Sequence, residues 1–548
     1  MDKVLSRLFV PLPSPEEMHL WDAEAMSLGL PQELLMENAA RAAFAVLKDY
    51  FPQLSGKRVV LIMGSGNNGG DAACLARLLL DVEAKPLVLH TKPLAGCKGT
   101  CGKHVRLARA CGVPFRRCPS KPDGSLAIPD NIPTPDILVD GLLGTGFRGA
   151  LKPQTLALVR AINVLPTPFV LALDIPSGLD GISGKPLPEA VRATATVSFQ
   201  AAKPGLLQPE AAMWTGRVHV RDIGIPTKTR QEAPCSFFLA DGRCLSPFAV
   251  ARPGVFKNSY GHVFIIGGAA GLGGAAHLAA RTALRAGCGL VTAAAPAPCL
   301  PDIKNGCAEI MTLALTPMPQ SQWPETLPDN LTAMIARGAS LVVGPGMGRG
   351  EDATEFLASL LDMPERPPTV FDADALALLA RQPALFARVS ERDILTPHPG
   401  EAALLLGCTA RDIQADRLHA LHALCSISHG VVVLKGSGTL VGQDRAPVLL
   451  CPYDVPQLSV GGSGDVLAGC LGGLLARVAK TETAPTGASP SLTVAGQAVA
   501  LHALAGKILA EKWPLRGNMA ASVADALPRA LFTYALREPE GDVQPWPR

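Results

Sequence analysis

Short apolar runs rich in β-branched residues recur along the chain, and each is followed by Gly or Asp and then by an Ala/Leu-rich segment of helical length. This alternation is typical of parallel sheets covered by helices. The first half predicts strands at 59–63, 87–90, 137–139, 169–173 and 196–199. The second half predicts strands at 263–266, 290–293, 341–343, 370–371, 394–395 and 431–434. We therefore expect an α/β protein that binds ligands beyond the carboxyl ends of its strands.

The length of 548 residues predicts several domains, since one domain takes about 150 residues. Turn-forming residues between Gly224 and Pro234 separate the two series of strands, so we place a domain boundary within 225–240. The expected domains span 1–230 and 240–535. The stretch 478–490 is rich in Thr, Pro, Ser and Ala and predicts a surface loop, and the last dozen residues predict a loose tail.

Composition excludes several classes of protein. Apolar residues make up 48% and charged residues 18%, which excludes general disorder. The 50 Lys and Arg nearly balance the 47 Asp and Glu without any block of like charge, so we expect neither a nucleic-acid nor a membrane-surface partner. No apolar run reaches the ~18 residues of a membrane span. The apolar run at the N-terminus is too short for a signal peptide.

Cysteine usage indicates a reducing compartment. The 14 cysteines are far fewer than the ~8–10% of residues found in disulfide scaffolds, and most stand singly in apolar stretches. We therefore expect a cytoplasmic protein. Cys97, Cys101, Cys111 and Cys118 lie close together in the sequence, but they lack the paired CxxC spacing of a zinc site. We expect no metal at that cluster.

A glycine-rich loop, GSGNNGGD at 64–71, follows the first predicted strand and opens a helix. Its glycines match GxGxxG, but the acidic residue expected about 20 residues later is missing, because Thr91 and Lys92 end the next strand. The free N–H groups at the helix start suit an anion, and the amides and carboxylate of the loop offer oxygen ligands for a cation. A Gly/Asn turn selected only for its positive φ is the structural alternative.

Two later strands in the first half end in carboxylates, Asp140 and Asp174, and each is followed by a Gly-rich turn. A single such carboxylate can be a helix cap. Since the carboxyl ends of parallel strands share one edge of a sheet, we expect the two to converge on one site.

The first half resembles the NAD(P)H-hydrate epimerase domain over nearly all of 1–228. The resemblance rests on LMENA (35–39), GSGNNGGD (64–71), VDGLLGTG (139–146) and LDIPSGLD (173–180), followed by 196–203 and 218–226. Ala72 departs from the family, which usually has Gly there. The resemblance implies a Rossmann-like three-layer αβα domain. It also implies that the hydrated nucleotide is bound by Asn67, Asn68, Gly69, Gly70, Asp71, Gly144, Thr145, Gly146, Phe147, Arg148, Gly149 and Ala150.

The same resemblance implies that Asn68, Asp140 and Ser177 bind K⁺, and that Asp174 contacts the reacting end of the substrate. We hypothesise that Asp174 moves a proton during R/S exchange at C6 of the hydrated nicotinamide ring, where a carboxylate also stabilises a transient iminium.

The second half carries its strongest signal in VGGSGDVLAG at 460–469. The glycines present N–H groups and the positive end of a helix dipole to a phosphate, and Asp465 at the same point can accept a proton from an attacking hydroxyl. A glycine-rich helix start with Asp as its cap is the structural alternative. Further candidate loops after predicted strands are GGAAGLGGAA (267–276), GPGMG (344–348), FDADAL (371–376), LTPHPGE (395–401) and VLKGSGT (433–439).

These motifs resemble the ribokinase-like superfamily and, within it, ADP-dependent NAD(P)H-hydrate dehydratase over about 245–535. TPHPGE together with GGSGDVLAG separates this family from sugar and vitamin kinases; Lys257-Asn258 departs from a family Lys-Gly. The resemblance implies a ribokinase-like αβα domain with Mg²⁺ and ADP. It places Ala275, Gly346, Gly348, His398 and Asp465 at the hydrate. It places Lys435, Gly436, Ser437, Gly438, Thr439 and Gly464 at the adenine nucleotide.

We therefore expect a bifunctional enzyme that repairs hydrated NADH and NADPH. The first domain would interconvert the R and S hydrates. The second would phosphorylate the ring hydroxyl of the S form with Asp465 as base and then expel phosphate. One alternative is a ribokinase-like kinase of vitamins or sugars with an accessory nucleotide-binding domain. Another is a non-catalytic NAD-sensing module. The sequence leaves open whether the protein is a monomer or a homo-oligomer and whether it uses ADP or ATP. It also leaves open whether NADHX or NADPHX is preferred and whether substrate is channelled between the domains.

Overall fold

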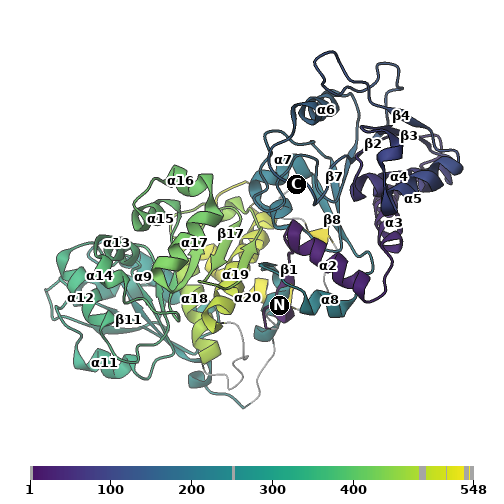
Figure 1. Ribbon diagram of the computed structural model, residues 1–548. Helices are drawn as coiled ribbons and strands as arrows, with labels where there is room; N and C mark the ends of the chain where they lie inside the picture. The colour runs from purple at the N-terminus through teal and green to yellow at the C-terminus, as the bar shows by residue number, and fades with distance from the viewer. Residues whose placement is uncertain (1–3, 250–253, 480–488, 514, 536–541, 544–548) are drawn as a thin grey trace. The chain divides into compact units, whose positions relative to one another are not determined.

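All the strands expected from the apolar runs are present, and they lie in two separate sheets (Figure 1). The computed structural model describes residues 4–249, 254–479, 489–513, 515–535 and 542–543. The chain divides into two compact units. Of the described residues, unit 1 holds 11–237 and 542–543, and unit 2 holds 4–10 and 238–535.

Unit 1 is built on an 8-stranded sheet in the order β19-β8-β7-β6-β5-β2-β3-β4. All neighbouring pairs are parallel except β19 with β8, which is antiparallel. The strands are β2 (Arg58–Met63), β3 (Lys85–His90), β4 (Phe115–Arg117), β5 (Ile137–Gly141), β6 (Val170–Leu173), β7 (Ala195–Phe199), β8 (Arg217–Arg221) and β19 (Asp542–Val543). The main helices are α2 (Pro15–Ser27), α3 (Gln32–Tyr50), α4 (Asn67–Leu80), α5 (Gly99–Ala110) and α6 (Pro153–Val164).

The central strands of unit 1 are apolar and buried along their length, as expected for a parallel sheet with both faces covered. Each crossover returns the chain so that the next strand begins at the same end of the sheet. The loops after β2, β5, β6 and β7 therefore gather at one edge, and this edge holds the predicted motifs.

Unit 2 is built on an 11-stranded sheet in the order β1-β9-β18-β17-β16-β15-β14-β13-β10-β11-β12. The segment from β12 to β16 is parallel, whereas β16, β17 and β18 pair antiparallel, so this sheet is mixed. The strands are β1 (Val10–Pro11), β9 (Phe237–Leu239), β10 (His262–Ile266), β11 (Leu290–Ala295), β12 (Met311–Ala314), β13 (Ser340–Val343), β14 (Thr369–Phe371), β15 (Ile394–Leu395), β16 (Val431–Leu434), β17 (Thr439–Gly442) and β18 (Val448–Cys451).

The helices of unit 2 include α9 (Gly273–Arg285), α12 (Glu351–Leu361), α13 (Asp374–Arg381), α15 (Pro399–Leu406), α17 (Arg417–Ser428), α18 (Ser463–Ala479), α19 (Pro490–Lys512) and α20 (Ala520–Ala535). A core of large apolar side chains, among them Phe264, Phe356 and Phe371, lies against the parallel part of the sheet. As in unit 1, the loops at the carboxyl ends of the parallel strands carry the predicted motifs.

The ends of the chain differ from the expected domain ranges. We placed 1–230 in one domain, but residues 4–10 belong to unit 2. The reason is local packing: Phe9 is buried, and its ring lies against Gly496 of α19. At the other end, β19 extends the sheet of unit 1. The predicted loop at 478–490 and the predicted tail fall mostly outside the described residues.

The described part of the chain contains one helix long and apolar enough to cross a membrane, α19, although no such stretch was expected. Within that stretch 94% of the residues are buried inside the structure, as in the core helix of a globular unit.

Candidate active sites

A cavity of about 950 Å³ lies at the carboxyl ends of the strands of unit 1. The loops after β2, β5, β6 and β7 line it together with side chains from α2 and α3. The predicted substrate residues that line it are Asn67, Asn68, Asp71, Gly144, Thr145, Gly146, Phe147, Arg148, Ala150 and Asp174. The structure therefore brings most of the predicted first site together.

Gly69, Gly70 and Gly149 do not line this cavity, although we predicted them as substrate residues. Gly69 is buried in the first turn of α4, where a Cβ would lie 2.1 Å from the carbonyl oxygen of Gly64. Gly70 packs against Met36 in the same way, because a Cβ at Gly70 would lie 2.5 Å from Met36 Sδ. Both glycines allow the helix start to approach its neighbours closely, and thereby shape the loop that does line the cavity.

Two of the three predicted K⁺ ligands, Asn68 and Ser177, contact the backbone of Leu143, and the third, Asp140, contacts Ser177. The N–H of Leu143 donates to Ser177 Oγ over 2.8 Å, and Asn68 Nδ2 donates to the Leu143 carbonyl over 2.7 Å. Ser177 Oγ in turn donates to Asp140 Oδ1 over 2.6 Å. Asn68 Oδ1 is buried without a hydrogen-bond partner in the described structure. Burial raises the pKa of Asp140 to about 6, against the effect of its hydrogen bonds from Ser177. An unpaired buried amide oxygen, linked through Leu143 and Ser177 to a buried carboxylate, fits a cation with oxygen ligands.

Asp174 lies at the end of β6 with a φ of +65°, a left-handed backbone that is uncommon for a residue with a Cβ. Its carboxylate contacts Nζ of Lys203, which is fully buried and lines the same cavity. Lys203 Nζ also donates to Ser198 Oγ over 3.2 Å and to the Phe199 carbonyl over 3.1 Å. Strained backbone held by a dense set of contacts is typical of functional sites.

Two further carboxylates face this ion pair across the cavity, Asp22 from α2 and Asp71 from α4. Burial raises the pKa of Asp22 to about 6; Lys203 opposes the rise and Asp174 adds to it. Burial also raises the pKa of Asp71 well above its usual range, and Asp174 and Asp22 raise it further. The wall of the cavity thus holds three carboxylates around one lysine.

Cationic side chains stand at the exposed rim of this cavity: Lys92, Arg117, Arg148 and Lys152. Positive charge beside the free amides of a helix start suits the phosphates of a nucleotide.

In the described part of the chain, the one group of His, Cys and carboxylate atoms close enough to hold a metal is Glu37, Cys74 and His104, within 4.8 Å of one another. The carboxylate of Glu37 is already paired with Arg77 at 2.7 Å and Arg41 at 3.0 Å. We interpret this group as a buried ion pair with its neighbours.

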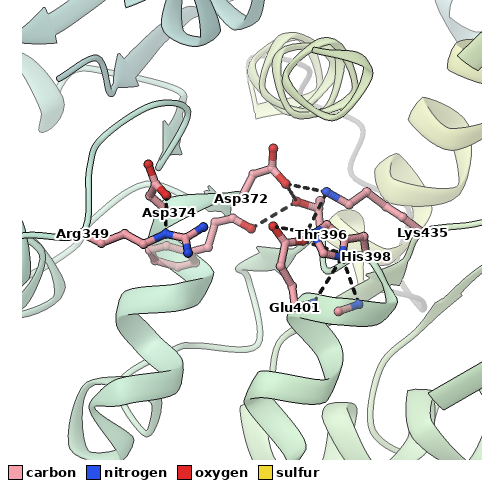
Figure 2. A network of polar contacts seen from close by, with 9 residues as sticks. Arg349, Asp372, Asp374, Thr396, His398, Glu401 and Lys435 are labelled. Carbon is pink, nitrogen blue, oxygen red and sulfur yellow. Dashed lines mark hydrogen bonds and ion pairs between the residues drawn. The ribbon is translucent and has the colours of Figure 1, made fainter. Parts of the chain in front are cut away.

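Unit 2 gathers a second set of charged groups at the carboxyl ends of β14, β15 and β16 (Figure 2). Lys435 Nζ lies 2.9 Å from Asp372 Oδ1 and 3.6 Å from Glu401 Oε2. Thr396 Oγ1 donates to Asp372 Oδ1 over 2.6 Å. Burial lowers the pKa of Lys435, but Asp372 and Glu401 more than reverse this, so that its pKa is raised overall.

Asp465 and Gly464 begin α18 beside this cluster. Burial raises the pKa of Asp465 to about 7, Asp372 raises it further, and Lys435 lowers it. A Cβ at Gly464 would lie 3.4 Å from Lys435 Nζ and 3.7 Å from Asp372 Oδ2, so this glycine keeps the helix start close to the cluster. A carboxyl that titrates near neutrality at a helix N-terminus can serve as a base.

His398 caps α15 and borders the same cluster. Its Nδ1 accepts from the N–H groups of Gly400 and Glu401 over 3.0 and 3.2 Å, and its Nε2 lies 3.5 Å from Glu401 Oε1. More than half of the side chain is exposed. The ring is therefore fixed in orientation while one edge faces solvent.

The remaining predicted residues of unit 2 lie on loops at the same sheet edge. Gly346 and Gly348 follow β13 with positive φ, and Gly348 N–H donates to Asp374 Oδ2 over 2.9 Å. Ala275 lies in the first turn of α9. The predicted nucleotide residues Gly436, Ser437 and Gly438 lie in the turn between β16 and β17, and Thr439 begins β17. Arg417 holds this turn through the carbonyls of Leu434, Lys435 and Gly438.

Lys203, Asp22, Asp372, Glu401 and Arg417 were not among the predicted site residues. Lys203 had a usable signal, since a lysine inside an apolar stretch after a strand is unusual. Asp22 had no such signal, because a single acidic residue in a helical segment is common. Lys435 stays a predicted nucleotide residue, and its ammonium lies between the carboxylates of Asp372 and Glu401.

Two family models match the chain. The model described as YjeF-related protein N-terminus matches residues 32–205. The model described as NAD(P)H-hydrate dehydratase matches residues 263–529.

Relatives match over nearly the whole length. A bifunctional NAD(P)H-hydrate repair enzyme from Coxiella burnetii is 34% identical over 501 residues, which cover 90% of this chain and 94% of the relative. The enzyme of the same description from Moorella thermoacetica is 33% identical over 518 residues, with 94% of each chain covered. Among solved structures, an ADP/ATP-dependent NAD(P)H-hydrate dehydratase from Bacillus subtilis, co-crystallised with ATP/Mg²⁺, is 21% identical, covers 53% of this chain and 96% of its own, and has a TM-score of 0.42.

Proposed function

The chain belongs to the family of bifunctional NAD(P)H-hydrate repair enzymes, and from this premise we propose how its two sites divide the work. Unit 1 interconverts the R and S hydrates of NADH and NADPH. Unit 2 dehydrates the S hydrate to the reduced nucleotide. Matches to both halves of one bifunctional family, over 90% or more of the chain, favour this function over a vitamin or sugar kinase with an accessory domain.

In unit 1, the hydrated nucleotide occupies the cavity of about 950 Å³. Its phosphates lie towards the rim cations and the N–H groups at the start of α4, and its ring lies towards Asp174. The carboxylate of Asp174, fixed by Lys203, stabilises positive charge on the ring when C6 loses its hydroxyl. The buried wall of carboxylates around Lys203 supports this assignment of the reacting end.

K⁺ is proposed as the resident ion of unit 1, bound by Asn68, Asp140 and Ser177. The unpaired Oδ1 of Asn68 supports this proposal. When bound, the ion neutralises Asp140 and fixes the loop that follows β5. The test is epimerisation rate against K⁺ concentration with Na⁺ as the control. Asn68→Ala should abolish the K⁺ dependence, and a rate that is equal in both salts would contradict the proposal.

In unit 2, the adenine nucleotide lies along residues 436–439 and the start of α18, with ADP as the phosphoryl donor. Asp465 accepts the proton of the ring hydroxyl as its oxygen attacks the terminal phosphorus of ADP, and AMP leaves. The C6–O bond then breaks and phosphate departs with its electron pair, while loss of a proton at C5 restores the dihydronicotinamide. Mg²⁺ supplies charge neutralisation at the phosphates when bound, and the carboxylates around Lys435 suit it.

The observation that carries the whole proposal is the presence of a carboxylate at both sheet edges, Asp174 and Asp465, in a chain matched throughout by the repair family. The test incubates the full chain with separated R and S hydrates, with and without ADP, and follows the absorbance of the reduced ring. The S hydrate should return the absorbance only with ADP, and the R hydrate should do so after conversion to S. Untouched hydrates would contradict the function, and binding without turnover would favour the NAD-sensing alternative.

We propose a reducing compartment, the cytoplasm, for this enzyme. All 14 cysteines are free, and most are buried, where burial raises the thiol pKa of several of them, including Cys118 to about 11.

A further inference from the structure

The cavity of unit 1 is lined by three carboxyl groups, which is more than the binding of a nucleotide requires. Asp22, Asp71 and Asp174 come from α2, α4 and the end of β6, and all three line the cavity with Lys203. Phosphates are anionic, so a carboxylate in this wall repels them unless it faces the uncharged ring. The cluster therefore marks the ring end of the cavity, and its members need separate roles there.

Asp174 is the ion-paired member. Its Oδ1 contacts Lys203 Nζ and is within 3.4 Å of the backbone N–H of Phe199. This oxygen is therefore occupied by two donors. Asp174 is therefore suited to face positive charge on the ring, and less suited to give a proton away.

Asp22 and Asp71 differ from Asp174, because in the described structure neither of their carboxyl groups forms a hydrogen bond or an ion pair. Of these two, Asp22 is the more accessible, since Asp71 is buried at the start of α4. Asp22 lies partly buried on the inner face of α2, between the buried Trp21 and Ala25. The charged or titratable groups that line the cavity with it are His19 from its own helix, Asp71 from α4, Asp174 after β6 and Lys203 after β7, together with the cations of the rim, Lys92, Arg117, Arg148 and Lys152. Burial raises its pKa to about 6, which keeps a protonated fraction available near neutrality.

We propose that Asp22 is the catalytic acid and base of epimerisation, an inference that rests on the function proposed for unit 1. The carboxyl of Asp22 gives its proton to the hydroxyl oxygen at C6, the C6–O bond breaks, and water leaves with the bonding electrons. The lone pair of N1 forms the N1=C6 double bond, and the resulting iminium is planar at C6.

Water then adds to the opposite face of C6, and the electron pair of the double bond returns to N1. The proton released by this water goes to the Asp22 carboxylate, directly or over one water molecule in the cavity. Asp22 thus ends protonated as it began, no proton or electron is gained or lost, and the only change is the configuration at C6. Asp174 neither gives nor takes a proton in these steps, and Lys203 acts as a positioning residue that holds it.

The test uses the full chain and measures R/S exchange by chromatographic separation of the two epimers without ADP. Asp22→Asn should slow the exchange at least ~100-fold, within the usual effect of losing a general acid. Asp22→Glu should recover part of the rate, because it keeps a carboxyl group. Glu24→Gln is the matched control: it removes a carboxylate from the same helix outside the cavity, and its exchange rate should equal that of the unchanged protein.

The pH profile separates catalysis from a merely structural role. For the unchanged protein, kcat/KM for exchange should fall about tenfold per pH unit above the pKa of about 6, since the protonated carboxyl is required. The residual exchange of Asp22→Asn should be flat with pH. Dehydration of the S hydrate with ADP, measured on the same preparations, should be unchanged, which shows that unit 2 is folded and that the loss is confined to unit 1.

Two results would overturn the proposal. One is an exchange rate of Asp22→Asn within threefold of that of the unchanged protein, and the other is an exchange rate of Asp22→Asn that falls with pH as it does in the unchanged protein. Failure of the unchanged protein to exchange the epimers at all would instead contradict the proposed function of unit 1. The two failures are therefore distinguishable in one set of measurements.

Discussion

Lys435 Nζ lies 2.9 Å from Asp372 Oδ1, and this ion pair links the end of β16 to the end of β14 in unit 2. Asp372 is 1% exposed, so its charge has little contact with water, and Lys435 offsets the cost of burying it. Asp465 is close enough for both charges to act on its carboxyl group in opposite directions. Burial is the main reason why the pKa of Asp465 is raised, and the two charges of this pair adjust the pH at which Asp465 becomes a base.

Removing the charge of Lys435 should shift the pH profile of dehydration upward. Asp465 acts as a base, so dehydration requires its ionised form, and the rate should rise with pH through the pKa of about 7. Lys435 lowers this pKa, so in Lys435→Gln the rise should move to higher pH. The measurement is kcat/KM for the S hydrate from pH 5 to 9. Arg445→Gln, which removes an exposed positive charge of the same unit, should leave the profile in place. A profile that moves to lower pH would contradict the role of Lys435.

Asp465→Asn should stop dehydration and leave epimerisation intact. The amide cannot accept the proton of the ring hydroxyl, and a loss of ~10²–10⁴-fold is expected for a missing general base. The assay compares return of absorbance from the S hydrate with chromatographic exchange of the epimers. Loss of both activities together would point to one shared site.

Asp174→Asn should have the converse effect and abolish exchange while dehydration of the S hydrate persists. The neutral amide cannot stabilise the iminium, and it leaves the fully buried Lys203 without its counter-charge. The unfolding temperature should therefore fall too. The double variant, Asp174→Asn with Lys203→Met, removes both charges of the pair. Its unfolding temperature should recover, but epimer exchange should not. Full exchange in either variant would rule out the role given to Asp174.

Gly69→Ala should destabilise unit 1, whereas Gly66→Ala should not. A Cβ at Gly69 meets the backbone oxygen of Gly64 at 2.1 Å, and backbone on both sides must move to make room. Overpacking of this kind costs about 1–3 kcal/mol. Gly66 in the same loop has φ −93°, and a methyl group added there would have nothing within 4 Å, so it is the matched control. Denaturant unfolding of both variants is the measurement, and equal stability would contradict the packing argument.

Much of the fold could be predicted because its signals are local. The runs at 59–63 and 431–434 are short, apolar and β-branched, and they form β2 and β16 almost as expected. Several short strands were not expected, among them β4 and β12, which lie at the edges of their sheets, and β9, β17 and β18, which extend the sheet of unit 2 beyond its parallel part. Such short strands owe their conformation to their neighbours in the sheet more than to their own residues. The antiparallel pairing of β16 with β17 likewise depends on the turn between them, since β17 is only 4 residues long.

The sequence by itself determined the alternation of strands and helices, the glycine-rich loops and the carboxylates that follow strands, since each of these is written in residues adjacent along the chain. Only the tertiary structure decided which charges face one another. Lys203 reaches Asp174 and Asp22 joins them from a distant helix, Lys435 lies among carboxylates, and the N-terminal segment 4–10 packs in unit 2. Such pairings depend on the register of β-strands and on the packing of helices over them, and residues far apart in the chain carry no local signal of their final neighbours.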